Sequence, residues 1–289
     1  MTLNKDTNIL IIGLGVIGGS YAKALTDKGY KINCITKNES DIKYAIENKM
    51  ISYGTTTLDE ALISRAELII FALYPTTFVK WIEQNGSLIK TGALITDVTG
   101  VKGTVVRTVQ NMLPSGIEFI SAHPMAGREQ SGVEFSDPSV FVGANYIVTP
   151  TEKNTPEAIE ICCQLGYELG FSRISRLTIE EHDKMIAFLS QLTHCIAVSL
   201  MTCNEEEGLE KYTGDSFRDL TRIAKINDKM WSELFLMNKE PLLAEMDRFI
   251  SEFSLFRDMI ANGERENLQE KMKKATIRRA FFDKNKNAN

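Results

Sequence analysis

Three glycines spaced Gly-x-Gly-x-x-Gly, directly after a short apolar run near the amino end, constrain the fold of this chain more than any other feature. The run Ile9–Ile12 is typical of a buried strand, and a helix is expected to open directly after the glycines. In such a unit the first glycine permits a tight turn, the second lets a pyrophosphate approach the backbone, and the third lets the helix pack closely on the strand. We therefore predict a dinucleotide site in a Rossmann-type domain. The residues assigned to the site are Gly13, Leu14, Gly15, Val16, Ile17 and Gly18.

The end of the second predicted strand bears on which dinucleotide binds. An NAD site usually has an acid there, roughly 20 residues after the glycines, which accepts hydrogen bonds from the ribose. Here Thr36 stands in that place and Lys37 follows, and this pair could bind a 2′-phosphate. We therefore favour NADP over NAD. The alternative is that Lys37 is solvated and that Glu39 or Asp41 contacts the ribose. Leu73, at the end of a further strand, is also assigned to the cofactor site.

The chain changes character near residue 173. Sixteen of its 19 glycines and six of its seven prolines lie before residue 174. In that part apolar runs alternate with helical stretches, which indicates a parallel sheet covered on both faces. Strands are expected at 9–12, 31–35, 68–73, 93–98, 118–122 and 146–149, and helices at 20–28, 41–48 and 156–169. We expect an α/β Rossmann-type domain, residues 1–173, followed by an all-α domain, residues 174–289.

The second part contains a helix that is apolar on most sides. Helices are expected at 179–201, 217–226, 229–237, 241–262 and 264–282. The stretch 179–201 is apolar nearly all round in its second half, which is typical of a helix buried in a bundle or in a subunit interface. We therefore expect a homodimer formed through the helical domain.

Composition excludes several classes of protein. The net charge of −5 argues against nucleic acid or an anionic membrane as the main partner. No run approaches about 20 uninterrupted apolar residues, so no membrane span is expected. The five cysteines have no CxxC pair, and the three histidines lack metal-ligand spacing, so we predict no disulfide framework and no metal. The protein is expected to be cytoplasmic.

His123 is the first candidate catalytic residue. It follows the predicted strand 118–122, at the carboxyl end where open α/β sheets bind ligands, and Pro124 restricts its backbone. A histidine there, with a pKa near neutrality, suits general-base removal of a proton from a hydroxyl that is being oxidised. The alternative is a structural histidine.

The apolar helix carries further polar candidates. Gln191 and His194 are three residues apart and share a face, where a polar substrate or a neighbouring helix could satisfy them. His182, between two acids near the start of the helix, is more typical of a half-exposed helix-end histidine. Arg222 either grips a substrate carboxylate with its planar fork or belongs to a surface ion-pair cluster with Asp219.

Together these residues resemble the prephenate dehydrogenase family, including its arogenate-using members, over most of the chain. The resemblance is carried by the glycine motif and by four blocks. These are Asp97–Lys102, His123–Gly127 with Glu129 and Ser131-Gly132 after it, Ser190–His194 and Asp219–Ala224. Gly100 stands where the family commonly has serine, and Thr193 stands where it has proline.

The resemblance implies a fold and a reaction. It implies a Rossmann domain followed by a helical domain that dimerises, and oxidative decarboxylation of prephenate to 4-hydroxyphenylpyruvate with NAD(P)+ as hydride acceptor, in tyrosine biosynthesis. It assigns His123 as the base, His194 and Gln191 to the substrate, Arg222 to a substrate carboxylate and His182 to a supporting role.

The resemblance leaves some points open. Because Gly100 carries no hydroxyl, a hydroxyl partner for His123 has to come from Thr99 or from water. The alternatives are an arogenate dehydrogenase, a dehydrogenase of the β-hydroxyacid or imine-reductase kind, and a catalytically silent NADP-binding sensor. Dehydrogenases of the β-hydroxyacid or imine-reductase kind place a lysine or aspartate on the corresponding helix, where this chain has Gln191 and His194.

Overall fold

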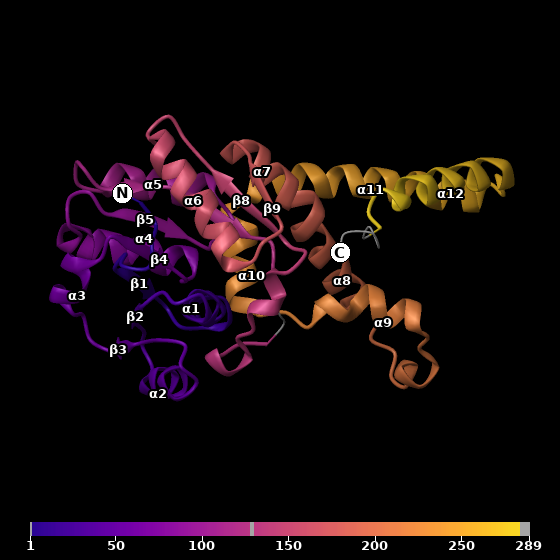
Figure 1. The fold of residues 1–289 in the computed structure, drawn as a ribbon. Coiled ribbons are helices and arrows are strands. Elements are labelled where there is room, and N and C mark those ends of the chain that lie inside the picture. Colours follow the sequence, from indigo (N-terminus) through magenta and orange to yellow (C-terminus); the bar gives the residue numbers. More distant parts are fainter. Residues whose placement is uncertain (1, 128–129, 284–289) are drawn as a thin grey trace. The chain divides into compact units, whose positions relative to one another are not determined.

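The described residues of this computed structural model are 2–127 and 130–283. They form two compact units, which divide between Lys239 and Glu240. The larger one holds the predicted dinucleotide site and its sheet (Figure 1).

A six-stranded parallel sheet forms the centre of the larger unit. Its strands are β1 (Ile9–Ile12), β2 (Ile32–Ile35), β3 (Tyr53–Thr55), β4 (Leu68–Phe71), β5 (Leu94–Asp97) and β6 (Glu118–Phe119). Their order in the sheet is β3-β2-β1-β4-β5-β6. This is the Rossmann order, with its reversal between β1 and β4. The predicted parallel sheet is confirmed. The edge strand β3 was not expected, because Tyr53-Gly54-Thr55 contains no apolar run.

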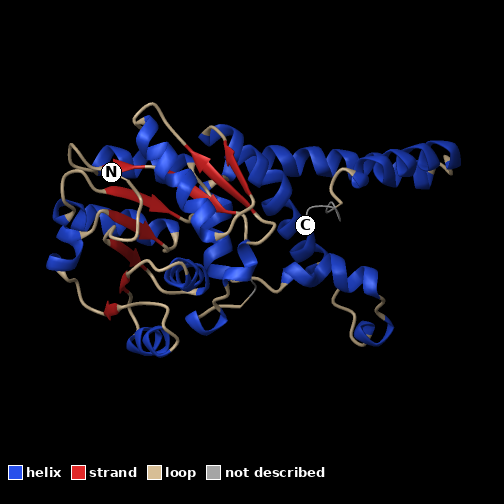
Figure 2. Ribbon diagram, in the orientation of Figure 1, coloured by secondary structure: helices blue, strands red, loops and turns tan. Residues whose placement is uncertain are grey.

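Helices cover both faces of this sheet (Figure 2). They are α1 (Val16–Asp27), α2 (Glu39–Glu47), α3 (Glu60–Arg65), α4 (Pro75–Asn85), α5 (Gly103–Met112) and α6 (Pro156–Leu169). Alternate β1 residues point to opposite faces. Ile11 packs in one core with α1 and α6, and Ile12 packs in a second core with α4 and α5. The continuous apolar strands predicted from the sequence are therefore buried on both sides.

A second, three-stranded sheet corrects one expectation. The predicted strand 118–122 is split at Ile120 into β6 and β7 (Ser121–Pro124). Strand β7 pairs antiparallel with β8 (Asn145–Thr149), which pairs parallel with β9 (Arg173–Arg176). The β6 ladder ends because the Asp97 carboxylate accepts the backbone N–H of Ala122. His123 therefore lies within a strand, not after one.

The long apolar helix is continuous but not uniformly α-helical. It consists of α7 (Ile179–Ile186), a π-helical turn (Ala187–Leu192) and α8 (Thr193–Thr202). Among the described residues, Ile179–Thr202 has the length and apolar content that could cross a membrane, although no span is expected from the sequence. The same helix buries His182 and Gln191, which are hydrogen-bonded within the larger unit. These contacts make it a helix of this unit's fold.

Strand β9 extends to Arg176, so the expected all-α part does not start at residue 174; beyond this strand the remaining helices confirm the expected helical pattern. The larger unit continues with α9 (Asp215–Thr221), the short 3-10 turn Arg222–Ala224 and α10 (Asp228–Met237). The smaller unit holds most of α11 (Lys239–Ala261) and α12 (Arg265–Ala280). Within this unit Lys271 of α12 forms an ion pair with Glu252 of α11. All five cysteines are free, and Cys203 is the exposed one among them.

Candidate functional site

The glycine loop after β1 matches the geometry that a dinucleotide requires. Gly13 adopts a φ of +98°, and its N–H donates to Ile35. A Cβ on Gly18 would lie 2.1 Å from the Gly13 carbonyl oxygen, so the third glycine is needed for close packing of α1. A Cβ on Gly15 would meet nothing within 4 Å. The loop therefore leaves space beside Gly15, at the amino end of α1, where a pyrophosphate would approach.

The other predicted cofactor residues surround this loop. Thr36 is buried at the end of β2, and its hydroxyl accepts a hydrogen bond of 3.3 Å from the Leu14 N–H. Lys37 is exposed. Leu73 follows β4 and lies close to Gly13, since a Cβ on Gly13 would come within 2.8 Å of the Leu73 side chain. The three strand ends thus meet at one edge of the sheet.

A buried ion pair lies at the same edge, at the end of β5. Asp97 and Lys102 have fully buried side chains, and their Oδ2 and Nζ atoms are 3.1 Å apart. The ammonium also donates to the Ala122 carbonyl at 2.7 Å, and Asp97 Oδ1 accepts from Ser121 Oγ at 2.6 Å. Asp97 is in register with Phe71 of β4, which is in register with Ile12 of β1. At the usual strand spacing Asp97 is therefore about 10 Å across the sheet from the glycine loop.

These contacts hold the backbone next to His123, and a second histidine holds its ring. His123 Nδ1 is 2.9 Å from His182 Nε2, and His182 Nδ1 is 2.7 Å from Asp183 Oδ1. The Asp183 carboxylate also accepts the backbone N–H groups of Lys102 and Gly103, at 2.9 and 2.7 Å. The structure thus joins three side chains in a line from β7 to the start of α5.

His182 differs from its expected half-exposed position. Its side chain is fully buried. Thr178 and Glu181 form a capping box that begins α7, and the first turn of this helix brings His182 against His123. His182 is therefore not a helix-end histidine in solvent, because it is buried and its Nε2 is hydrogen-bonded to His123 Nδ1.

The surroundings of His123 favour its neutral form. Burial lowers its pKa well below the ordinary value, and the electrostatic effects of the neighbouring His182 and of Lys102 lower it further. The pKa of His182 is also lowered, chiefly by burial, although the Asp183 hydrogen bond opposes this effect. At neutral pH His123 is therefore an unprotonated base.

The neighbourhood of His123 Nε2 contains Gly100 but not the Thr99 hydroxyl. A Cβ on Gly100 would lie 3.7 Å from Nε2 and from the Leu234 side chain, so a small group fits between them. The Thr99 hydroxyl donates to Asp97, and Lys102 Nζ lies 3.3 Å from it. Thr99 thus belongs to the buried ion-pair network, and its assignment as the hydroxyl partner of His123 stays a prediction that these contacts do not support.

Gln191 and His194 both face α10. Gln191 is buried in the π-helical turn, where it donates to the Leu234 carbonyl at 2.8 Å and accepts from Asn238 at 2.7 Å. His194 stacks on Trp231, with ring centroids 3.7 Å apart, and its Nδ1 is 2.8 Å from the Ser190 carbonyl. Two polar residues in an apolar helix thus have partners within the protein. Their assignment to substrate binding stays a prediction.

Arg222 begins the 3-10 turn after α9, and that turn packs against α8. It is exposed. The neighbouring Arg218 forms an ion pair of 2.8 Å with Asp215. An arginine beside the helix of His194 is suitably placed to bind a substrate carboxylate, and this role also stays a prediction. Glu129, quoted for the family resemblance, lies outside the described residues.

Sequence reasoning did not assign Asp97, Lys102 or Asp183 to the site. Two signals pointed to them. Asp97 ends a buried strand, where a carboxylate needs a partner, and Asp183 directly follows His182. Neither signal names the partner, because Lys102 and Asp183 meet across 81 residues of sequence.

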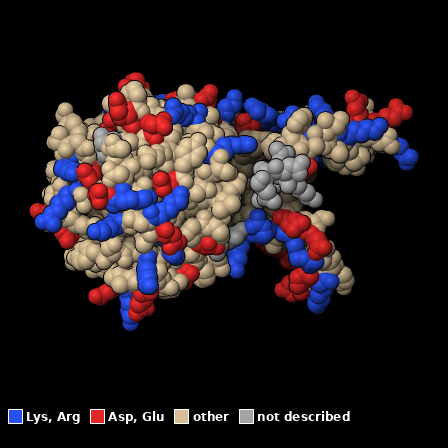
Figure 3. Space-filling view, in the orientation of Figure 1, with Lys and Arg blue, Asp and Glu red and all other residues tan. Residues whose placement is uncertain are grey.

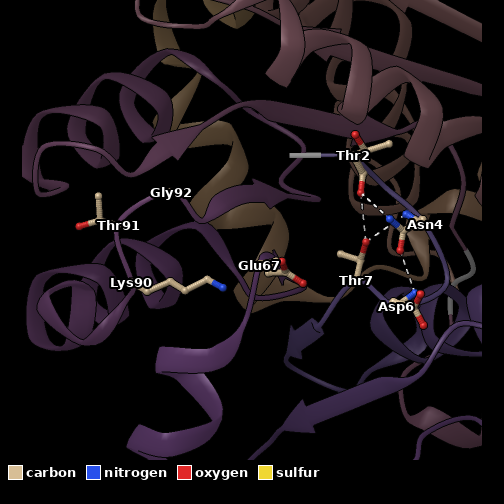
Figure 4. Close-up of a pocket in the computed structure, with 8 residues that line it drawn as sticks. All are labelled: Thr2, Asn4, Asp6, Thr7, Glu67, Lys90, Thr91 and Gly92. Carbon is tan, nitrogen blue, oxygen red and sulfur yellow. Dashed lines mark hydrogen bonds between the residues drawn. The ribbon is translucent and has the colours of Figure 1, made fainter.

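A separate polar pocket lies at the opposite, amino ends of the strands. Its volume is about 490 Å³, and Figure 4 shows its lining. The lining residues come from the segments before β1, β4 and β5, and the charged ones among them are Asp6, Glu67 and Lys90. Its position at the amino ends excludes it from the site described above. On the face drawn in Figure 3, basic and acidic side chains are interspersed rather than gathered by sign.

Comparison with known proteins places this geometry among relatives. The sequence model described as prephenate dehydrogenase, nucleotide-binding domain, matches residues 21–172. The model described as prephenate dehydrogenase, dimerization domain, matches residues 178–274.

Individual proteins of known name are also similar to this chain. A prephenate dehydrogenase of Bacillus subtilis is 33% identical over 93% of this chain and 74% of its own length. A cyclohexadienyl dehydrogenase of Zymomonas mobilis is 29% identical over 95% of each chain. The crystal structure of prephenate dehydrogenase from Aquifex aeolicus with hydroxyphenyl propionate and NAD+ superposes with a TM-score of 0.89. It is 30% identical, and the match covers 98% of this chain and 100% of that one.

Proposed function

This chain belongs to the prephenate dehydrogenase family, and from that premise we propose that it oxidises and decarboxylates prephenate to 4-hydroxyphenylpyruvate, a step toward tyrosine. The observation that carries the proposal is the position of His123 in β7, beside the carboxyl end of β5 in the dinucleotide-binding sheet. Its Nδ1 is held by His182, and its Nε2 faces the space at Gly100. A neutral, oriented imidazole there is the base that oxidation of a ring hydroxyl requires.

The reaction follows from what His123 can accept. Prephenate carries a hydroxyl on a non-aromatic ring that also bears a carboxylate. His123 Nε2 takes the hydroxyl proton while a hydride leaves the same carbon. Loss of the ring carboxylate as CO2 then makes the ring aromatic, which renders the step effectively irreversible. The oxygen emerges as a phenolate and takes a proton back to give the phenol of the product.

A nicotinamide dinucleotide fits the glycine loop. The open space beside Gly15, the close packing at Gly18 and the free amino end of α1 are the features that accept a pyrophosphate. Leu14, Val16 and Ile17 would contribute the loop around it, with Leu73 beside them. When bound, the nicotinamide supplies the hydride acceptor.

For the dinucleotide, we propose NADP+ rather than NAD+. The residues that support this choice are at the end of β2. Thr36 is uncharged, and its hydroxyl is committed to Leu14, so no carboxylate there repels a 2′-phosphate. Lys37 is exposed and available to pair with it. The Aquifex aeolicus relative was crystallised with NAD+, which makes NAD+ the alternative.

The substrate is a dianion, and we propose Arg222 as the group that binds one of its carboxylates. Guanidinium binds carboxylate through two parallel hydrogen bonds, which fixes orientation as well as affinity. His194, on the neighbouring α8, and Gln191 are proposed to complete the substrate site. This division assigns residues 1–173 to the dinucleotide and residues 174–289 to substrate binding and dimerisation.

We propose a homodimer formed through the helical residues. The larger unit exposes apolar side chains on the long helix, among them Phe188, Leu189 and Met201. The smaller unit does so on α11 and α12, where Phe253 and Ile277 are examples. Exposed apolar faces of this extent are typical of subunit interfaces. Sedimentation of the purified protein tests this point, and a monomer at micromolar concentration would contradict it.

The five free cysteines favour a reducing compartment, and we propose a cytoplasmic location. Fractionation of cells that express the chain with a carboxyl-terminal tag tests the location. Recovery with the membrane pellet would contradict it.

One assay tests the reaction, the substrate and the cofactor together. Purified protein is incubated with prephenate or arogenate and with NAD+ or NADP+, and absorbance at 340 nm reports the reduced cofactor. The proposal expects the highest kcat/KM with prephenate and NADP+, with release of one CO2 for each reduced cofactor. A preference for arogenate would indicate the arogenate-using branch of the family. Reduction with neither substrate would contradict the proposal and favour a silent dinucleotide sensor.

A further inference from the structure

We propose that His182 and Asp183 are positioning residues that form a proton relay behind His123. Asp183 fixes the tautomers of both histidines, and His182 accepts the Nδ1 proton of His123 when His123 Nε2 receives the proton of the substrate. This inference rests on the proposed function, because it assigns His123 as the base. It starts from the line His123–His182–Asp183 that joins β7 to α7 and the amino end of α5.

Asp183 can only accept hydrogen bonds in this arrangement. Its Oδ1 receives the Lys102 N–H and its Oδ2 receives the Gly103 N–H, and backbone N–H groups are donors without exception. These two bonds stabilise the ionised carboxylate at the start of a helix, where negative charge is favoured. His182 Nδ1, 2.7 Å from Oδ1, must therefore carry a hydrogen and donate it.

The tautomers of both rings follow from this one fact. A neutral imidazole has one N–H and one acceptor nitrogen. Since His182 Nδ1 carries its hydrogen, His182 Nε2 is an acceptor, and His123 Nδ1 at 2.9 Å must donate to it. His123 Nε2 is then left without a hydrogen, on the side that faces Gly100. The carboxylate two residues along this line thus decides which nitrogen of His123 is basic.

The same line accommodates the proton during the reaction. When His123 Nε2 takes the hydroxyl proton, its Nδ1 proton can pass to His182 Nε2. The positive charge then lies on His182, beside the negative charge of Asp183. Because the product phenolate needs a proton, the transfer reverses, and the protein gains no net proton over the reaction. Lys102 and Asp97, the other charged groups against this cluster, neutralise one another.

Hydrogen bonds from neighbouring segments fix the position of Asp183. The Asp183 backbone carbonyl accepts from Asn238, the residue after α10, at 2.9 Å, and the capping box at Thr178 fixes the start of α7. His182 is fully buried, so water does not compete for its ring nitrogens. The relay therefore acts through geometry that exists before substrate binds, which is the condition for an oriented base.

Histidine NMR tests the tautomers directly. The chain has only three histidines, so ring 15N signals from 15N-histidine-labelled protein can be assigned with single variants. In the wild type we expect the hydrogens of His123 and His182 on Nδ1, with both Nε2 atoms unprotonated. In Asp183→Asn the amide can donate to His182, which moves the hydrogen of His123 to Nε2. The matched control is Glu180→Gln, an exposed acid of the same helix, which should leave the pattern unchanged.

Hydrogen of His123 on Nε2 in the wild type, or an unchanged pattern in a folded Asp183→Asn variant, overturns the proposal. His182→Gln provides a second variant that keeps the bonds of Asp183 to α5. Glutamine can accept from His123 Nδ1, yet it cannot take the proton.

Turnover then tests the second half of the proposal. We expect kcat of Asp183→Asn to fall by roughly 10²–10⁴-fold, the range for a lost general base, with little change in cofactor affinity. We expect His182→Gln to keep the His123 tautomer and still to lose at least about tenfold in kcat. Wild-type kcat in His182→Gln would overturn the relay while leaving His123 as the base. Wild-type kcat in His123→Asn would instead contradict the proposed function itself.

Discussion

Lys102 Nζ lies 3.1 Å from Asp97 Oδ2, and neither side chain has any exposed surface. The pair holds the strand that carries His123. Lys102 donates to the Ala122 carbonyl, and Asp97 accepts the Ala122 N–H, so both backbone groups of the residue before His123 are fixed. A buried ion pair here therefore contributes to the orientation of the base.

Lys102→Met should strongly destabilise the protein. The substitution leaves the Asp97 carboxylate buried without its cation. Such a change typically lowers the free energy of unfolding by about 3–5 kcal/mol, which is a large fraction of the total stability of a protein. The double variant Lys102→Met/Asp97→Asn removes both charges and should be closer to wild type. Urea unfolding followed by circular dichroism measures both; a loss below about 1 kcal/mol for the single variant would contradict this account.

His123→Asn should reduce turnover by roughly 10²–10⁴-fold, because the variant retains a polar side chain but has no basic nitrogen. Dinucleotide affinity should be unchanged, since the glycine loop is untouched. Stopped-flow turnover and calorimetric titration with the dinucleotide measure the two quantities separately. A parallel fall in dinucleotide affinity would indicate a structural role for His123.

Arg222→Ala should raise KM for the substrate, because it removes the proposed carboxylate contact, by about 10–100-fold for the loss of a charge-assisted pair. The matched control is Arg218→Ala, four residues earlier, whose ion pair with Asp215 is exposed. Initial rates over a range of prephenate concentrations distinguish the two. Equal KM values for Arg222→Ala and wild type would exclude the role.

Gly15→Ala should weaken dinucleotide binding, whereas Gly18→Ala should lower the stability of the fold. A Cβ on Gly15 meets nothing within 4 Å, so the fold should tolerate it while the dinucleotide loses the space beside the backbone. A Cβ on Gly18 would lie 2.1 Å from the Gly13 oxygen, so that variant should lose about 1–3 kcal/mol of stability. Thermal unfolding with and without dinucleotide checks both. A dinucleotide affinity in Gly15→Ala equal to that of wild type would place the pyrophosphate elsewhere.

Stability should fall as the pH drops below about 6.5, the pKa of an unfolded histidine. His182 and His123 have lowered pKa values in the folded protein, so in this window the unfolded state binds more protons than the folded state. Each buried histidine contributes a slope of up to about 1.4 kcal/mol per pH unit, which ends below its folded pKa. Urea unfolding between pH 7 and about 5 should therefore give a shallower slope for His182→Gln than for wild type. Identical slopes would count against the lowered pKa.

Some of the fold was predictable because it depends on local pattern. A strand followed by Gly13, Gly15 and Gly18 has few backbone solutions, and the loop has the expected geometry. The helices beyond residue 173 follow from apolar spacing, so the expected 229–237 corresponds closely to α10 (Asp228–Met237). The strand at Tyr53–Thr55 was missed because an edge strand with an exposed tyrosine lacks that pattern.

The candidate site was predictable in its members but not in its connections. His123 can be identified as a candidate from two local features of the sequence, its place at the end of a predicted strand and the proline that follows it. His182 was expected at a half-exposed helix end, and nothing within its own helix indicates that it faces His123, 59 residues away. Thr99 was expected to serve His123, whereas its hydroxyl donates to Asp97, a choice that only packing determines.

The sequence by itself determined that this chain forms a dinucleotide-binding sheet followed by helices, because short-range periodicity and glycine geometry act within a few residues. Only the tertiary structure decided how its ionisable groups are paired. The Asp183 carboxylate accepts the backbone N–H of Lys102 across 81 residues, and the Lys102 ammonium donates to the Ala122 carbonyl across 20. Such pairs form where the topology excludes water from two distant segments together, and the free energy of an unpaired buried charge makes the partner obligatory. Spacing along the chain carries no record of that choice.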